Sequence, residues 1–310
     1  MKTDSGVLEQ ENMNRGMPFS ASLFTVFLTI LFGANAVAVK VTLVGVGVYS
    51  AAGIRFGLAA IAITLWSIYT GRSLRIDRGQ AKSLFVISLL FTVQVALFYH
   101  GLNLTTASHG TLIANLLPFV VLVLAHYFIP GEPFTRKKIA GVMLGFIGVL
   151  LLVFDKQEAA ADVLTGDLLI LVAVLFWGTN AVIIKKIITT THPVLVTLYP
   201  MIFAAPCLLL AGYFLDTEMV EYIDLPIFLC FLYQSFVTAS FGYIAWNTLV
   251  REYGTTIVHS FVYLMPISGV FFGVLLLGEP VTASLVGAII LIVLGIIVVN
   301  HKNGSRKSSH

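Results

Sequence analysis

The basic residues of this 310-residue chain lie at alternate ends of ten apolar segments, and this pattern is the strongest constraint on its fold. Most of the segments approach or exceed the roughly 20 apolar residues that a helix needs to cross the hydrocarbon core of a bilayer. If the amino terminus is placed in the cytoplasm, fifteen of the eighteen Lys and Arg residues fall on the cytoplasmic side. Cytoplasmic loops of membrane proteins carry this excess of positive charge. The pattern therefore predicts a multi-pass protein of the inner membrane with both termini in the cytoplasm.

The composition agrees with a membrane protein. Apolar residues make up 58% of the sequence and charged residues only 11%, against roughly a quarter charged in soluble domains. The net charge of +3 belongs to loops, so it indicates topology and not a nucleic-acid surface. The two cysteines, Cys207 and Cys230, form neither a disulfide framework nor a metal-binding spacing, so we expect no metal and no cofactor. The predicted spans are 18–43, 47–69, 82–103, 107–129, 137–154, 166–188, 193–214, 226–250, 255–277 and 281–300.

The chain repeats itself at about half its length. Residues 33–40 (Gly-Ala-Asn-Ala-Val-Ala-Val-Lys) match residues 178–185 (Gly-Thr-Asn-Ala-Val-Ile-Ile-Lys). Further landmarks recur in the same order, namely Pro118 and Pro266, then Gly-Glu-Pro at 131–133 and 278–280. Each half holds five spans, an odd number, so the second half must cross the membrane in the opposite sense. The sequence thus predicts an all-α integral membrane protein of ten transmembrane helices, arranged as two inverted five-helix repeats around a central cavity.

The repeat also defines the predicted domain boundaries. They are a cytoplasmic tail at 1–17, a first repeat at 18–154, an extracytoplasmic linker at 155–165, a second repeat at 166–300 and a cytoplasmic tail at 301–310.

Several short motifs resemble one known family. They are the Gly-x-Asn-Ala-Val start of each half, the Arg55-Phe56 step, the segments Tyr99-His-Gly-Leu102 and Trp246-Asn-Thr-Leu249, and the proline-centred helices that run into Gly-Glu-Pro. Together these motifs resemble the drug/metabolite transporter superfamily in its ten-span EamA branch. The resemblance implies a basket of two five-helix bundles that works by alternating access. It also implies a small-molecule substrate, most commonly an amino acid or related metabolite that is exported.

Other functions stay open at this point. The resemblance also covers uptake of a riboflavin-like vitamin or cofactor, and a receptor without transport is a more distant alternative. An enzyme is not expected, because the sequence contains no nucleophile–base arrangement and no metal motif in helical register. The partners we expect are a small solute and lipid. The Gly53-x-x-x-Gly57 and Gly141-x-x-x-Gly145 motifs favour close helix contacts within the chain or across a homodimer.

Polar residues inside spans are the candidate substrate contacts. Asn35 and Asn180 lie near the middle of related spans, where their amides could bind a polar solute or join two helices. Arg55 lies about two turns inside its span and could hold a carboxylate in a bidentate pair. It could equally extend to the interface or bond carbonyls at a helix end. Lys40 is expected to anchor its helix at the interface.

A mostly apolar pocket with a few polar groups suits small amphipathic solutes. Tyr and Trp near span ends ordinarily belong to the interfacial belt, which is the alternative for Tyr99. The remaining candidates for the cavity are Gln94, Phe98, Tyr99, His100, Trp177, Gln234, Tyr243 and Tyr263.

Pro118 and Pro266 lie within spans, where proline removes a backbone hydrogen bond and kinks a helix, so they are candidate gate residues. The Gly-Glu-Pro loops are expected to be structural, with Glu279 sealing the outer rim.

All fifteen Asp and Glu residues fall in tails, loops or span ends, with Asp167 at the start of the span 166–188. A proton-coupled carrier usually needs a buried carboxylate. We therefore expect a facilitator or exchanger. A relay through histidine stays open, because histidine titrates near neutral pH and His100, His109, His126 and His259 are in or near spans.

Overall fold

The computed structural model describes residues 17–128, 135–153, 161–188, 191–253, 257–258 and 261–300. Within these ranges the secondary structure is helical, apart from an isolated antiparallel bridge between Val46 and Val220. The tails at 1–16 and 301–310, residue 154, the segment 155–160 of the predicted linker, His259 and the first Gly-Glu-Pro loop at 131–133 lie outside the described residues.

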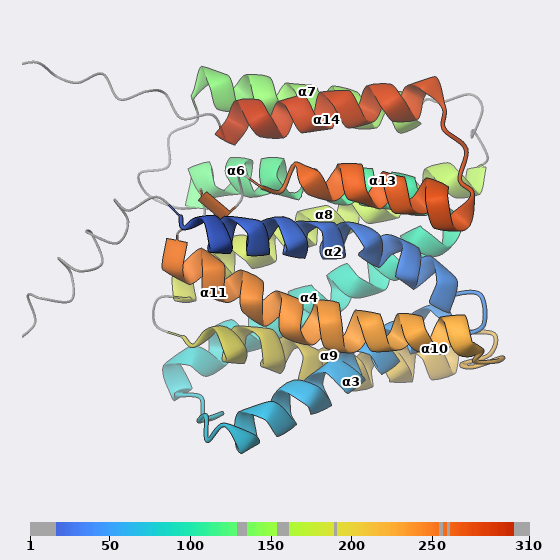
Figure 1. Ribbon diagram of the computed structural model, residues 1–310. Coiled ribbons are helices and arrows are strands. Elements are labelled where there is room, and N and C mark those ends of the chain that lie inside the picture. The colour runs from blue at the N-terminus through green and yellow to red at the C-terminus, as the bar shows by residue number, and fades with distance from the viewer. Residues whose placement is uncertain are drawn as a thin grey trace, which may run out of the picture.

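The helices run side by side as an elongated bundle (Figure 1). In chain order they are α2 (Phe19–Thr42), α3 (Val48–Tyr69), α4 (Arg78–Leu104), α5 (Ala107–Ala114), α6 (Leu117–Phe128), α7 (Arg136–Val153), α8 (Ala161–Ile187), α9 (Pro193–Leu215), α10 (Leu225–Leu232), the π-helix η1 (Tyr233–Gly242), α11 (Tyr243–Tyr253), α13 (Leu264–Leu277) and α14 (Ala283–Asn300).

Seven helical segments of the described chain are long and apolar enough to cross a membrane. They are α2, α3, α4, α5 with α6, α8, α9, and α10 through α11, and they contain 22 to 29 residues. At 1.5 Å per residue such helices span the roughly 30 Å hydrocarbon core. α13 and α14 are shorter apolar helices. The chain is therefore an all-helical, multi-pass membrane protein.

The helices differ from the predicted spans in ways that matter for function. α8 begins at Ala161, before the predicted start at residue 166, so Asp167 lies inside the helix and not at its end. The predicted span 107–129 consists of α5 and α6, separated by a turn at Asn115 and Leu116. The predicted span 226–250 contains the π-helix η1, where each turn holds more residues than an α-helical turn.

α5 continues into α6, and α10 continues through η1 into α11. The other successive helices run in opposite directions, so the loops gather at two ends of the bundle (Figure 1). We call one the Glu279 end, which carries the loops 43–47, 105–106, 216–224 and 278–282. The other is the Arg251 end, which carries the loop 70–77 and the start of α9.

Charge separates the two ends. Among the described residues, the basic side chains of the Arg251 end are Arg72, Arg75, Lys82, Arg136, Lys137, Lys138, Lys185, Lys186 and Arg251. The described part of the Glu279 end carries the base Lys40 and the acids Asp162, Asp167, Asp216, Glu218, Glu221, Asp224 and Glu279.

At the Arg251 end, partial burial and then the charges of Arg72 and Arg251 lower the pKa of His192, which therefore stays neutral at physiological pH.

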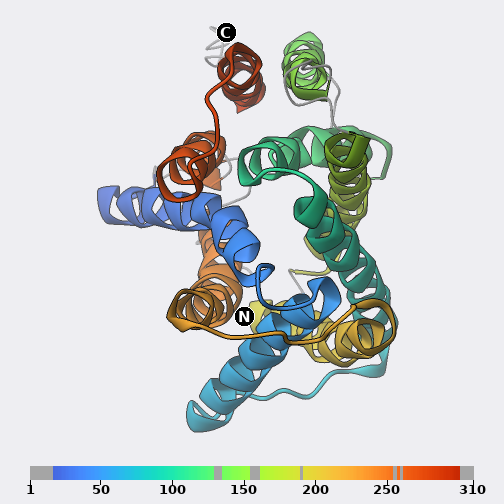
Figure 2. The same cartoon turned by 90° about the vertical axis from the view of Figure 1, so that its right-hand side faces the viewer.

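The main helix contacts join early helices to late ones. α3 packs on α9, α7 on α14, α4 on α8, and α2 on α13. α8 also packs on α5 and α6, and α2 on α10 and η1. In the view along the bundle, α7 and α14 stand together as a pair at one edge (Figure 2).

Glycine sets the closest of these contacts. A Cβ atom on Gly33 of α2 would lie 1.9 Å from Ser268 Oγ of α13, and one on Gly178 of α8 would lie 2.5 Å from Val120 Cγ1 of α6. The predicted packing motifs likewise face helices of the same chain, because Gly53 meets Leu209 of α9. Helices in lipid associate through such close packing, since lipid tails give no hydrophobic drive between them.

The two prolines do not kink continuous helices as the sequence suggested. Pro118 is the second residue of α6, directly after the turn at 115–116, and Pro266 is the third residue of α13, after the turn at 261–263. Proline is well placed in the first turn of a helix, because its missing N–H would have no intrahelical partner there. Both prolines therefore mark the start of a helix.

We predict that Gly33→Ala destabilises the protein, because the added methyl group meets both Ser268 Oγ and, at 2.7 Å, the Met265 carbonyl oxygen. Overpacking of this kind costs roughly 1–3 kcal/mol, which should lower the thermal unfolding midpoint in detergent by several degrees. Gly57→Ala is the matched control, because its Cβ would lie 3.7 Å from Ala205, an ordinary contact. Equal midpoints for the two variants would contradict the prediction.

Candidate functional site

A buried arginine lies inside the bundle. Arg55 of α3 is 3% exposed, and its Nη1 donates to the Tyr99 hydroxyl of α4 at 3.2 Å. Its Nη2 donates to Thr238 Oγ1 of η1 at 3.2 Å, and the guanidinium carbon lies 4.8 Å from the centre of the Phe56 ring. Arg55 thus neither extends to the interface nor bonds a carbonyl at a helix end. No carboxylate of the described residues lies within ion-pair distance of it.

The arginine belongs to a polar network that joins four helical elements. The Tyr99 hydroxyl donates to Gln234 Oε1 at 3.0 Å, and Gln234 Nε2 donates to the Ala38 carbonyl of α2 at 3.1 Å. The Thr238 hydroxyl reaches Asn35 Oδ1, also of α2, at 3.2 Å. The network therefore connects α2, α3, α4 and η1. It unites four of the residues that the sequence proposed for the site, namely Asn35, Arg55, Tyr99 and Gln234.

The structure settles the location of Tyr99 and adds Thr238 to the network. Tyr99 is 1% exposed, so it belongs to the interior and not to an interfacial belt. Thr238 is fully buried and was not among the predicted residues. Its position four residues after Gln234 is the available signal, because residues at this spacing lie on neighbouring parts of a helical surface. The π-helix turns Gln234, Ser235, Thr238, Ala239 and Ser240 toward the interior.

Several buried polar atoms of α3, α4 and η1, elements that contribute to this network, have no hydrogen-bond partner in the described part of the chain. They are Arg55 Nε, Gln94 Oε1 of α4 and Ser235 Oγ of η1, on residues that are 3%, 5% and 0% exposed. A buried donor or acceptor without a partner costs roughly 1–3 kcal/mol. Such atoms are therefore candidate contacts for a polar solute.

The other predicted residues are spread over the bundle. Asn180 of α8 is 4% exposed, but its Oδ1 has no partner among the described residues, so the two asparagines of the repeat do not occupy equivalent polar networks. Phe98 stacks edge-on against Tyr99, with ring centres 6.4 Å apart. Four predicted residues remain. His100 stacks on Tyr49, and Trp177 and Tyr263 are half-buried. Tyr243 is half-buried next to Phe32, with ring centres 5.9 Å apart.

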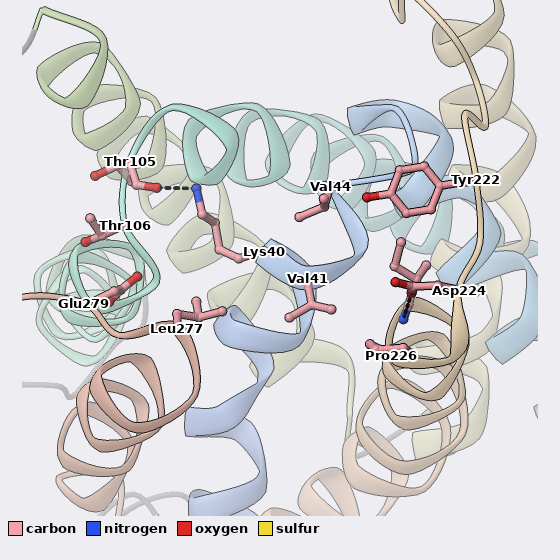
Figure 3. A pocket seen from close by; sticks show the side chains of 11 residues that line it. Lys40, Val41, Val44, Thr105, Thr106, Tyr222, Asp224, Pro226, Leu277 and Glu279 are labelled. Carbon is pink, nitrogen blue, oxygen red and sulfur yellow. Dashed lines mark hydrogen bonds between the residues drawn. The ribbon is translucent and has the colours of Figure 1, made fainter.

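A cavity of about 380 Å³ opens at the Glu279 end (Figure 3). Its size lies within the usual range for small-molecule sites. Val41 and Val44 of α2 line it, and Thr42 between them accepts a hydrogen bond from Gln234 Nε2 at 3.4 Å. The Arg55 network thus begins within one helical turn of the cavity wall. The other lining residues are Lys40, Thr105, Thr106, Tyr222, Asp224, Pro226, Ile227, Leu277 and Glu279.

Charged side chains at this end bind backbone groups. Lys40 Nζ donates to the carbonyls of Leu102 and Thr105 at 3.0 and 2.8 Å, where α4 ends. Glu279 accepts from the backbone N–H groups of Ala107 and Ser108 at 2.6 and 2.9 Å, where α5 begins. Lys40 and Glu279 therefore fix both sides of the α4–α5 corner. The structural role expected for the Gly-Glu-Pro loop fits these contacts.

A carboxylate also lies inside a helix, contrary to the sequence-based expectation. Asp167 is 2% exposed in the second turn of α8 and lies 2.9 Å from His109 Nδ1. The expectation failed because α8 begins earlier than its hydropathy indicated. Among the described residues no group of three or more His, Cys, Asp or Glu side chains is arranged to hold a metal ion.

An apolar helical bundle with a buried polar network defines a multi-pass membrane protein with a polar interior. The family model described as the EamA-like transporter family matches residues 19–154 and again residues 164–301. The chain therefore belongs to the EamA-like transporter family, and the resemblance seen in the sequence is confirmed.

Individual relatives agree with this assignment. The transporter YyaM of Bacillus subtilis is 28% identical over 276 residues, covering 87% of this chain and 90% of the relative. A probable amino-acid metabolite efflux pump of Salmonella typhimurium is 27% identical over 287 residues, covering 87% of this chain and 91% of the relative. A solved crystal structure with a TM-score of 0.68 and 18% identity covers 90% of this chain and 96% of its own, which shows a common fold.

We predict that Glu279→Ala lowers stability by about 1–3 kcal/mol, because the α5 N–H groups lose a buried carboxylate acceptor. The measurement is the thermal unfolding midpoint in detergent. Glu218→Ala is the control, since Glu218 is an exposed acid at the same end. A Glu279→Ala midpoint equal to that of Glu218→Ala would refute the capping role.

Proposed function

We propose that this protein is a secondary transporter that exports amino acids or related metabolites by alternating access. The observation that carries the proposal is the buried charge of Arg55. A guanidinium removed from water without a counter-charge is expensive, by several kcal/mol. A solute carboxylate would offset that cost.

The unpartnered polar atoms of α3, α4 and η1 suit such a solute. The guanidinium has five N–H donors, and two hydrogen bonds use one donor each on Nη1 and Nη2. Its free Nε and a neighbouring Nη can hold a carboxylate in a bidentate pair. The unpartnered Gln94 Oε1 and Ser235 Oγ can accept hydrogen bonds from an ammonium or hydroxyl group. Phe56 and the mostly apolar helices can surround the rest of a small amphipathic molecule.

We further infer ten membrane crossings built as two inverted repeats, with the domain boundaries predicted from the sequence. The family model's two successive matches support a duplication. The contacts support it as well. In the two halves α2 corresponds to α8, and α13 corresponds to α6, so the α2–α13 contact at Gly33 has its counterpart in the α8–α6 contact at Gly178. The α3–α9 and α7–α14 contacts each join two helices that correspond between the halves.

We place the Arg251 end in the cytoplasm and the Glu279 end outside the inner membrane. The described bases gather at the former and most of the described acids at the latter, which supports this orientation. The predicted facilitator or exchanger mechanism depended on carboxylates being confined to loops and helix ends. The buried Asp167 removes that argument.

Cells that overproduce the protein should resist toxic amino-acid analogues, and Arg55→Gln should abolish the resistance. A hydrogen bond to a charged group contributes roughly 1.5–3 kcal/mol, so export by the variant should fall at least about tenfold. Arg72→Gln is the control, because Arg72 lies in a loop against the Trp66 ring. Growth and efflux of the analogue are measured at equal protein levels. Rescue of a riboflavin auxotroph at low vitamin, without analogue resistance, would instead favour vitamin uptake.

We also expect Asn35→Ala to lower export severalfold at unchanged protein yield, since Asn35 belongs to the Arg55 network. Asn180→Ala should lower export as well if its free Oδ1 meets the solute. Efflux rates and yields of monodisperse protein are compared with wild type. A loss of yield in parallel with efflux would assign both asparagines to packing alone.

A further inference from the structure

A histidine and an aspartate form a buried pair at the Glu279 end, away from the Arg55 network. His109 Nδ1 of α5 lies 2.9 Å from Asp167 Oδ2 of α8, and the two side chains are 4% and 1% exposed. The other carboxylate oxygen accepts from Thr105 Oγ1 at 2.6 Å. Thr105 also lines the 380 Å³ cavity, so the pair lies one residue behind its wall.

The pair lies at the contact between α8 and the α4–α5 corner. A Cβ on Gly101 of α4 would lie 2.7 Å from the Gly166 carbonyl oxygen, and one on Gly166 would lie 2.6 Å from that of Gly101. The two backbones therefore touch one residue before Asp167. Separation of α8 from this corner must break the His109–Asp167 contact.

Few other charges act on the pair. Lys40 of α2 and Glu279 of the loop 278–282 lie beside it, each bonded to the backbone of the α4–α5 corner. His100 of α4 and the exposed Asp162 of α8 are at the same end of the bundle. The described parts of α6, α7, α13 and α14 bring no charged side chain to this end.

We propose that His109 and Asp167 form a proton-binding site, and that the bound proton holds α8 against the α4–α5 corner. With one proton bound, an imidazolium faces a carboxylate and the pair has no net charge. Without it, a neutral ring faces a carboxylate, and the buried pair carries one negative charge. Burial penalises that charge, which favours separation of the helices and entry of water.

The chemistry is a single protonation. Water on the open side supplies the proton, one imidazole N–H bond forms, and the carboxylate remains ionised. The proton leaves when that N–H bond breaks, and water reached from the Arg251 side accepts it. If the proposed transport function also holds, a proton taken up at the Glu279 end and released at the other end would drive solute outward by antiport.

A thiol-labelling experiment tests proton binding without any solute. The full chain in lipid nanodiscs carries Cys207→Ser and Cys230→Ser together with the reporter Ile170→Cys. Ile170 is fully buried on α8 against Gly101 and Gly110, and cysteine is smaller, so it fits. A membrane-impermeant thiol reagent can reach it only when α8 leaves the corner. Rates are divided by those of Glu218→Cys, an exposed position, to remove the effect of pH on thiol reactivity.

The normalised rate should rise about tenfold between roughly pH 5.5 and pH 8, a coupling of ordinary size. His109→Gln should abolish this rise, whereas the matched control His100→Gln should keep it. Thr105→Val should move the midpoint of the rise to higher pH, because the unprotonated pair loses the hydroxyl that stabilises the carboxylate. If His109→Gln does not fold, the shift of the midpoint in Thr105→Val tests the proposal in its place.

A wild-type rate that is independent of pH would overturn the proposal, because His109 would then be only a neutral donor to Asp167. So would a pH dependence that survives in His109→Gln. Proteoliposomes test the coupling separately: a pH gradient should drive an amino acid uphill in the wild type and only allow downhill flux in His109→Gln. If none of the twenty amino acids is carried, the proposed function fails, and the labelling result still decides the proton site.

Discussion

The structure depends on one constraint of the bilayer, which is that no water is available to satisfy a free backbone N–H or C=O group. Where the helices of this chain are interrupted, charged side chains take the place of water. Glu279 binds the first N–H groups of α5, Lys40 binds the last carbonyls of α4, and Asp216 binds the first N–H groups of α3 at 2.9–3.2 Å. All three lie at the Glu279 end. The charges there therefore hold the corners of the bundle in addition to marking its topology.

Arg55 differs from these residues because it binds only side chains. Its charge is shared among a phenol, a hydroxyl and an aromatic face, and no described carboxylate lies beside it. This arrangement keeps the guanidinium in place without neutralising it. A site of this kind gains most from a ligand that brings a negative charge. The unpartnered polar atoms of α3, α4 and η1 add hydrogen-bonding capacity. Many small zwitterionic solutes could use these groups, so the site defines a chemical class more readily than a single compound.

α4 connects the two sites that we propose. Tyr99 of the Arg55 network and Thr105 beside the His109–Asp167 pair lie six residues apart on the chain, which corresponds to about 9 Å along a helix. α4 packs on α8, with the Gly101–Gly166 contact between them. A movement of α8 against α4 would therefore change both the proton site and one wall of the solute site. The single helix α4 is therefore enough to couple proton binding at one site to solute binding at the other.

The sequence by itself determined the membrane class, the family and most helix bounds, because hydropathy, loop charge and paired motifs depend on local composition. It also singled out Asn35, Arg55, Tyr99 and Gln234, since polar groups are rare in apolar spans. Only the tertiary structure decided which of these residues meet, because the contacts join helices far apart in the chain. It also placed Asp167 in the interior: the first turns of α8 are polar enough to resemble a loop, and only packing against α4 and α5 buries Gly166 and Asp167.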